Sequence, residues 1–147
     1  MRQAADITAI IVATLGAVIA IGGAWAWWRA SSGRWFWALW RVAQLSTTAL
    51  AAVALIALLT GFDPGAGLFW LYMVLPIAVS IIAEQLRAAS AQTILDQREL
   101  EDAQAVGRLP AEDQHRIVYA ILARETWIIA LAGAVIAFLA LRAIATG

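Results

Sequence analysis

Four long apolar stretches alternate with shorter polar segments along the chain. They run from Ile7 to Trp28, from Val42 to Phe62, from Leu68 to Ala83 and from Ile117 to about Ala145. A helix needs about 20 apolar residues to cross about 30 Å of hydrocarbon. The runs are continuous rather than alternating, which indicates helices and not barrel strands, because backbone groups in lipid must be hydrogen-bonded within their own segment. We therefore predict an all-α polytopic membrane protein with four transmembrane helices, folded as one domain over residues 1–147.

The segment between the third and fourth apolar stretches is also predicted to be helical. Residues 83–106 contain no Gly or Pro and are rich in Ala, Gln, Leu and Glu, which favour helices. Gly107 is a helix end, and the sequence LPAEDQ then restarts a helix, with Pro110 at its first position and acidic residues in its first turn. We predict that the third helix runs on to Gly107 and that residues 88–116 form a cytoplasmic helical hairpin.

The positions of the arginines predict the orientation in the membrane. Cytoplasmic connections carry an excess of basic residues. The first connection carries Arg29 and Arg34, whereas the second, GFDPGAG, has no basic residue. The third connection carries Arg87, Arg98, Arg108 and Arg116. We therefore expect a location in the bacterial cytoplasmic (inner) membrane with both termini outside. The word AWA near Trp25 also fits a signal-peptide cleavage pattern, but the apolar run is longer than a usual signal sequence, which favours a retained helix.

Aromatic and basic residues gather at the first connection, WAWWRASSGRWFWALWR. Tryptophans at this spacing are typical of an aromatic belt at the membrane interface. Arg29 and Arg34 flank the tight turn within this stretch and are the candidates for contacts with anionic lipid headgroups. Membrane lipids are therefore the partner that the sequence indicates most directly.

Charged residues interrupt the apolar pattern near the predicted cytoplasmic boundary. A charge in hydrocarbon costs about 2.5 to 3.5 kcal/mol even on a lenient insertion scale, so such residues pair with one another or face water, and they often mark solute or proton paths. The alternative is that they extend to the interface and hold the helices together. We predict one polar cluster composed of Arg41, Glu84, Arg87, Arg124 and Glu125.

Deeper polar residues are few. They either line a narrow path or bond neighbouring helices, and the second use is the more common one. The candidates for a path lining are Gln44, Thr47, Thr48 and Ser80.

Composition excludes several classes of function. The chain has no Cys and one His, which argues against thiolate metal sites, a Cys nucleophile, a His-based metal cluster and a bis-His haem within one chain. The net charge is zero and there is no phosphate-binding loop, so nucleic acid is not an expected partner. We expect no cofactor, no metal and no enzymatic activity.

Two functional classes remain from the sequence. The first is a scaffold or accessory subunit whose cytoplasmic hairpin docks a partner, and it is favoured because the middle of the predicted bundle carries few polar groups. The second is a homo-oligomeric channel or transporter for an ion, proton or small solute, with the polar cluster at its cytoplasmic mouth. In either class we expect a homo-oligomer or a larger membrane complex, because four helices enclose little space.

Overall fold

The computed structural model describes residues 1–65 and 67–146. Five helices account for most of these residues: α1 Arg2–Trp28, α2 Arg34–Leu59, α3 Gly67–Gln97, α4 Ala103–Gly107 and α5 Ala111–Thr146. No strand occurs among the described residues. The helices α1, α2, α3 and α5 are each long and apolar enough to cross a membrane. The predicted all-α class with four candidate membrane-spanning helices is confirmed.

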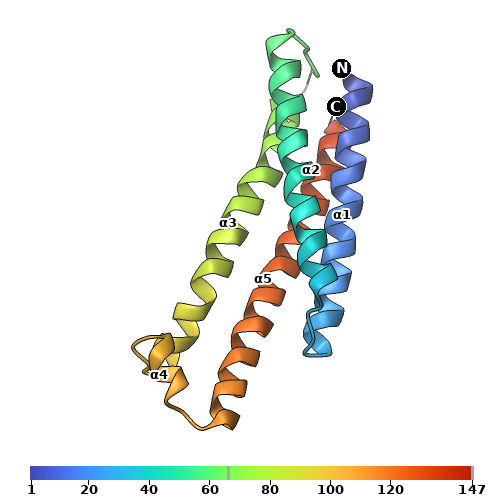
Figure 1. The fold of residues 1–147 in the computed structure, drawn as a ribbon. Helices are drawn as coiled ribbons and strands as arrows, with labels where there is room; N and C mark the ends of the chain where they lie inside the picture. The colour runs from blue at the N-terminus through green and yellow to red at the C-terminus, as the bar shows by residue number, and fades with distance from the viewer. Residues whose placement is uncertain (66, 147) are drawn as a thin grey trace.

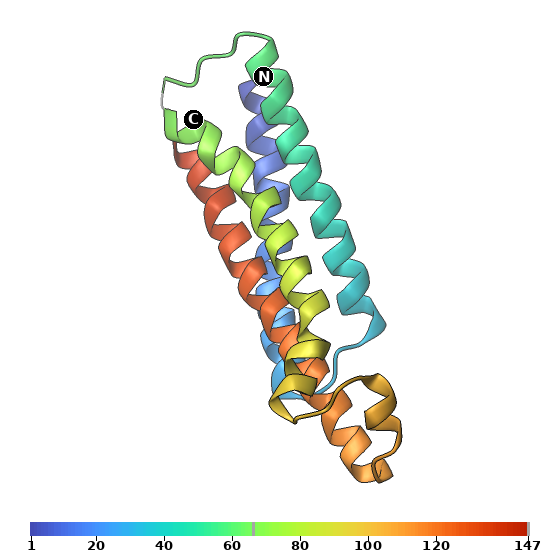
Figure 2. The same cartoon turned by 90° about the vertical axis from the view of Figure 1, so that its left-hand side faces the viewer.

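The four long helices form an antiparallel bundle (Figure 1). Both termini and the connection between α2 and α3 lie at one end, and the α1–α2 turn lies toward the other. Helix α1 packs mainly against α5, α5 also packs against α3, and α2 contacts α1 and α3. Figure 2 shows that the end of α3, the short α4 and the start of α5 continue beyond the α1–α2 turn. The molecule is therefore a bundle with a helical hairpin at one end.

The contact between α1 and α5 is unusually close at two glycines. A Cβ atom built on Gly16 would lie 2.7 Å from the carbonyl oxygen of Gly133, and one built on Gly133 would lie 2.8 Å from the carbonyl oxygen of Gly16. Small residues let helix backbones approach in a membrane, where packing and not the hydrophobic effect drives association. Each glycine is the first residue of the sequence GAVIA, which occurs at residues 16–20 and 133–137.

Large side chains fill the remaining interior of the bundle. On α2 and α3, the side chains of Leu50, Phe69 and Met73 are at most 1% exposed. On α1 and α5, Ile19 and Ile136 are buried to the same extent. Large residues thus pack around the seam of small residues between α1 and α5, as in a core of native packing density.

The prediction that the third helix runs to Gly107 is wrong, because α3 ends at Gln97. The chain reverses there through Glu99, which has the left-handed φ angle of 57°. The N–H of Leu100 then donates to the carbonyl oxygen of Leu95 at 3.0 Å, which closes the end of the helix. This is the usual hydrogen-bond pattern of a helix C-terminus, but with Glu where Gly is the common residue. The absence of Gly and Pro in this segment therefore gave no warning of the break.

The residues after this reversal form the separate helix α4. Its N-terminal cap is Asp102, whose carboxylate accepts a hydrogen bond from the N–H of Ala105 at 2.8 Å. Asp competes with the helical backbone in this way and favours caps over helix interiors. The predicted start of the next helix at Pro110 is correct to one residue, since α5 begins at Ala111 with acidic residues in its first turn.

The glycine contact leads to a testable prediction. We expect Gly16→Ala to destabilise the folded protein by about 1 to 3 kcal/mol, because the new methyl group meets backbone atoms of α5 that cannot move without separating the helices. The change is measured by thermal unfolding in detergent. Gly67→Ala is the matched control, since no atom of the described part of the chain other than its own neighbours lies within 4 Å of a Cβ built at Gly67. Equal stability of the two variants would contradict the close contact.

Candidate functional site

The carboxylate of Glu84 on α3 accepts hydrogen bonds from two helices. Its Oε1 atom lies 2.6 Å from Nη2 of Arg87 and 3.4 Å from Nη2 of Arg41 on α2. Its Oε2 atom accepts from Nε of Arg87 at 3.2 Å, from the indole Nε1 of Trp40 at 3.1 Å and from Nε2 of Gln44 at 3.3 Å. Nη1 of Arg41 also donates to Oε1 of Gln44 at 2.8 Å. One carboxylate therefore connects α2 to α3.

Arg87 extends these contacts to α5. Its Nη1 atom lies 3.7 Å from Oε2 of Glu125, a side chain that is only 16% exposed. Its guanidinium carbon also lies over the ring of Trp37 on α2, 5.7 Å from the ring centre. We call Arg41, Glu84, Arg87 and Glu125 the charged cluster. Its two positive and two negative side chains balance, which lowers the cost of placing charges close to a low-dielectric region.

Arg124 does not join the charged cluster, contrary to the sequence-based expectation. It is exposed, and it forms no ion pair with any described residue. Successive residues of a helix point about 100° apart, so Arg124 and Glu125 cannot both face α3. The other four predicted members, Arg41, Glu84, Arg87 and Glu125, lie together.

Sequence reasoning missed the two tryptophans that contact the charged cluster. Trp40 was assigned with its neighbours to an interfacial aromatic belt, but it is 1% exposed and donates to Glu84. Trp37 is half-buried and lies beside Arg87. Their spacing in the sequence could have indicated this contact. Residues at intervals of three and four share one face of a helix, and the residues with this spacing are Trp37, Trp40, Arg41 and Gln44.

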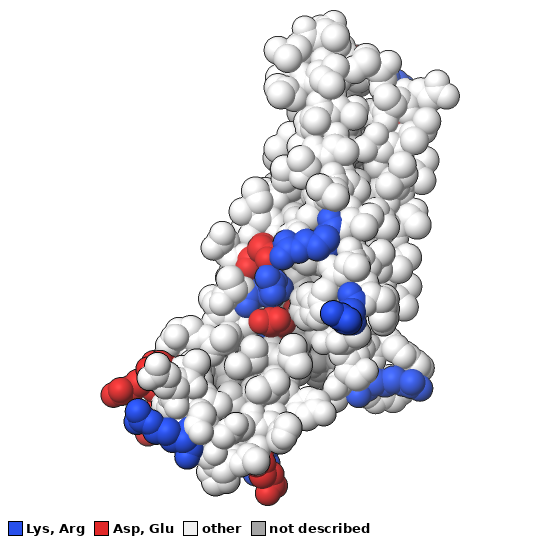
Figure 3. Space-filling view, in the orientation of Figure 1, with Lys and Arg blue, Asp and Glu red and all other residues white. Residues whose placement is uncertain are grey.

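The charged cluster lies well away from the end that holds the termini. At about 1.5 Å per residue, Glu125 is about 32 Å along α5 from Thr146, close to the thickness of the hydrocarbon layer. In Figure 3 charged side chains gather over the middle and lower part of the face, and the part near the termini is almost entirely white. The length of the apolar part thus matches one bilayer, with the charged cluster at its edge.

The predicted path-lining residues lie in different environments: Thr47 and Ser80 are buried, Gln44 is half-buried and Thr48 is exposed. Gln44, Thr48 and Ser80 line a groove of about 430 Å³ between α2 and α3, together with Glu84. Thr47 is outside the lining of this groove, and its hydroxyl donates to the backbone oxygen of Gln44 at 2.9 Å. The groove lies on the outer surface of the bundle, so a path through it needs a second wall.

The two candidate lipid-binding arginines lie on either side of the α1–α2 turn, and both are exposed. The guanidinium of Arg29 stacks over the ring of Trp25, 4.6 Å from its centre. Arg34 is the first residue of α2. Both positions suit the level of a headgroup, because Trp and Arg are common at that level.

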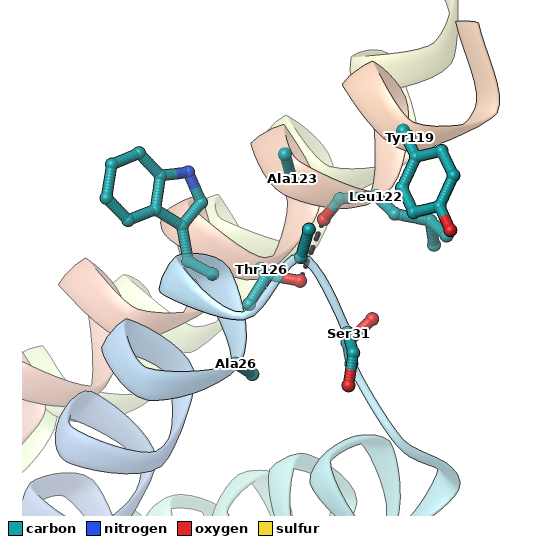
Figure 4. A pocket seen from close by; sticks show the side chains of 9 residues that line it. Ala26, Ser31, Tyr119, Leu122, Ala123 and Thr126 are labelled. Atoms are coloured by element: carbon teal, nitrogen blue, oxygen red, sulfur yellow. Dashed lines mark hydrogen bonds between the residues drawn. The ribbon is translucent and has the colours of Figure 1, made fainter. Parts of the chain in front are cut away.

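A small pocket lies beside this turn, against α5 (Figure 4). Its walls include Ser31 and Ser32 from the turn and Tyr119 and Thr126 from α5. The hydroxyl oxygen of Ser32 is buried there without a hydrogen-bond partner. The volume of about 20 Å³ is enough for one water molecule, which would satisfy that oxygen. The pocket is therefore too small for a substrate.

Comparison of the chain with family models, with curated proteins and with solved structures finds no match. The described residues contain no group of three or more His, Cys, Asp or Glu side chains placed to hold a metal ion.

The contacts of Glu84 lead to the second prediction. We expect Glu84→Gln to lower the free energy of unfolding by about 2 to 3 kcal/mol, because two guanidinium groups then lose a charged acceptor in a partly buried place. Thermal unfolding in detergent measures the change. Glu112→Gln is the control, since the Glu112–Arg116 pair is mostly exposed, at 77% and 64%, and exposed pairs contribute little. A Glu84→Gln protein as stable as the control would show that the carboxylate is solvated.

Proposed function

We propose that the protein is an integral membrane scaffold or accessory subunit whose cytoplasmic hairpin docks a partner. The observation that carries this proposal is that α3 and α5 extend well past the charged cluster. At about 1.5 Å per residue, α3 continues about 15 Å from Arg87 to its end, and α5 begins about 21 Å before Glu125. A bundle that only had to cross the membrane would have no use for this extension.

The charge of the hairpin supports docking of a basic partner. Between residues 92 and 116 there are six acidic residues and three arginines, whereas the whole chain is neutral. The acidic residues are Asp96, Glu99, Glu101, Asp102, Glu112 and Asp113, and the arginines are Arg98, Arg108 and Arg116. A surface of this kind attracts basic proteins and speeds their association. Anionic lipid headgroups repel it, which favours a hairpin that stands away from the membrane.

Packing inside the bundle also favours a scaffold over a monomeric transporter. The backbones of α1 and α5 touch at Gly16 and Gly133. Leu50 and Met73 fill the space on the other side and are fully buried. A path between these helices would require them to separate, which a close-packed interior resists.

The proposed orientation has the hairpin in the cytoplasm and both termini outside. We expect a reporter fused after Gly147 to be active only in the periplasm and a reporter inserted at Gly107 to be active only in the cytoplasm. The basis is the arginine content of the connections. Paired fusions to alkaline phosphatase and to a fluorescent protein measure the two locations. The reverse pattern would place the hairpin outside and end the proposal of a cytoplasmic partner.

The docking role is tested by shortening the hairpin. We expect a protein with matched deletions in both arms within residues 92–116, and a short connecting loop, to insert and fold but to lose its cytoplasmic partner in a pull-down. Helix pairs tolerate short antiparallel connections, and the charged cluster is left intact. Circular dichroism and thermal unfolding check the fold. A shortened protein that keeps every partner would contradict the scaffold function.

A charge-reversal pair sharpens this test. Glu99→Lys with Glu101→Lys changes two exposed acidic residues of the hairpin, and we expect slower partner association with a weaker dependence on salt. Asp6→Lys, at the opposite end of the bundle, is the matched control and leaves binding unchanged. An equal effect of both changes would mean that the hairpin does not set partner choice.

The second candidate function is a homo-oligomeric channel or transporter. The groove lined by Gln44, Thr48, Ser80 and Glu84 favours it, because polar side chains otherwise avoid the lipid-facing side of a bundle. A second protein wall would convert the groove into a closed path. Loss of an ion or proton flux in liposomes on Glu84→Gln, with all partners retained by the shortened hairpin, would favour this function over the scaffold.

A further inference from the structure

The groove between α2 and α3 presents polar groups toward the lipid. The side-chain amide of Gln85 is exposed at its edge, and it makes no hydrogen bond with the described residues. The hydroxyl of Thr48 is also exposed and reaches only a backbone oxygen of its own helix, 2.9 Å away. The side chain of Arg41 is 62% exposed beside them. Such groups are normally turned inward in a membrane protein.

The groove runs from the edge of the bilayer, at Glu84 and Gln85, inward to Ser80 and Thr48, where polar groups that face lipid are costly. Ser80 is only 4% exposed, but it borders the groove and lies about 20 Å along α3 from Gly67, inside a hydrocarbon layer of about 30 Å. Thr48 lies about 17 Å along α2 from Leu59, at a similar depth. Hydrocarbon offers no hydrogen bond to an amide or a hydroxyl, so whatever covers the groove must bring polar groups of its own.

We propose that a second copy of this chain covers the groove and forms a two-fold dimer with α3 at its centre. In this dimer the Gln85 amide pairs with that of the other copy, and Ile81 of each copy enters the groove of the other. A primary amide carries both donors and an acceptor, so it is complementary to itself across a two-fold axis. Ile81 can pack into the groove of the other copy, because it lines its own groove and its side chain is 56% exposed.

Two features of the chain favour a second copy over a phospholipid headgroup. Among the described residues no cationic side chain lines the groove to hold a phosphate, and Arg41 beside it is already engaged by Glu84 and Gln44. The dimer axis runs along the membrane normal, so both copies keep one orientation, and the face outside the groove remains free for lipid. The inference does not depend on the hairpin, but such a dimer would supply the second wall that the channel function requires.

Cysteine cross-linking tests the dimer directly, because the natural chain has no Cys. Single variants Ile81→Cys and Gln85→Cys are purified, reconstituted in phospholipid vesicles and oxidised with copper phenanthroline. We expect both to give a disulfide-linked dimer. Leu131→Cys is the control, since Leu131 is 48% exposed at a similar depth but lies between α3 and α5, outside this groove. No dimer from either variant, or equal cross-linking of the control, would overturn the proposal.

A second measurement separates the possible occupants. We expect Gln85→Leu to weaken dimerisation about 3- to 20-fold, the range for a side-chain hydrogen bond between membrane helices, with unchanged helical content and unfolding temperature. The dimer fraction is measured by light scattering at several protein-to-detergent ratios. Native mass spectrometry of the unaltered protein should show a dimer. A monomer that retains one phospholipid, lost in Gln85→Leu, would assign the groove to lipid and overturn the proposal.

Discussion

The close backbone contact between α1 and α5 is the constraint on which the rest of this structure depends. At Gly16 and Gly133 each helix occupies the space that a Cβ atom of the other would need. This contact makes α1 and α5 the central pair, against which α2 and α3 pack from the sides. Helices α2 and α3 share fewer contacts with each other, and a groove remains between them.

The charged cluster compensates for that looser packing. Glu84 receives hydrogen bonds from Arg41, Trp40 and Gln44 of α2, while Arg87 reaches from α3 to Glu125 of α5. Hydrogen bonds to a charged acceptor are stronger than neutral ones, and their strength grows at the edge of a low-dielectric region. Because the cluster is neutral as a whole, it joins three helices without leaving an isolated charge near the lipid.

The charged cluster also divides the molecule into two parts with different surfaces. Toward the termini the exposed side chains are mostly apolar, with Arg2, Asp63 and Arg142 as exceptions, and beyond the cluster the hairpin is acidic. The first part fits a bilayer and the second fits water. This division is the physical basis for proposing that the membrane part anchors the protein while the hairpin makes contact with another protein.

Apolar run length and isolated charges are local properties, so the helix class, the four candidate membrane helices and most of the charged cluster were predictable from the sequence. It did not determine the end of α3, where Glu99 adopts a conformation that Gly usually supplies. Nor did it separate Arg124 from the cluster or place Trp40 in the core. Those outcomes depend on which face each helix turns toward its neighbours. Only the packing of α1 on α5 and of α2 and α3 around them decides that rotation.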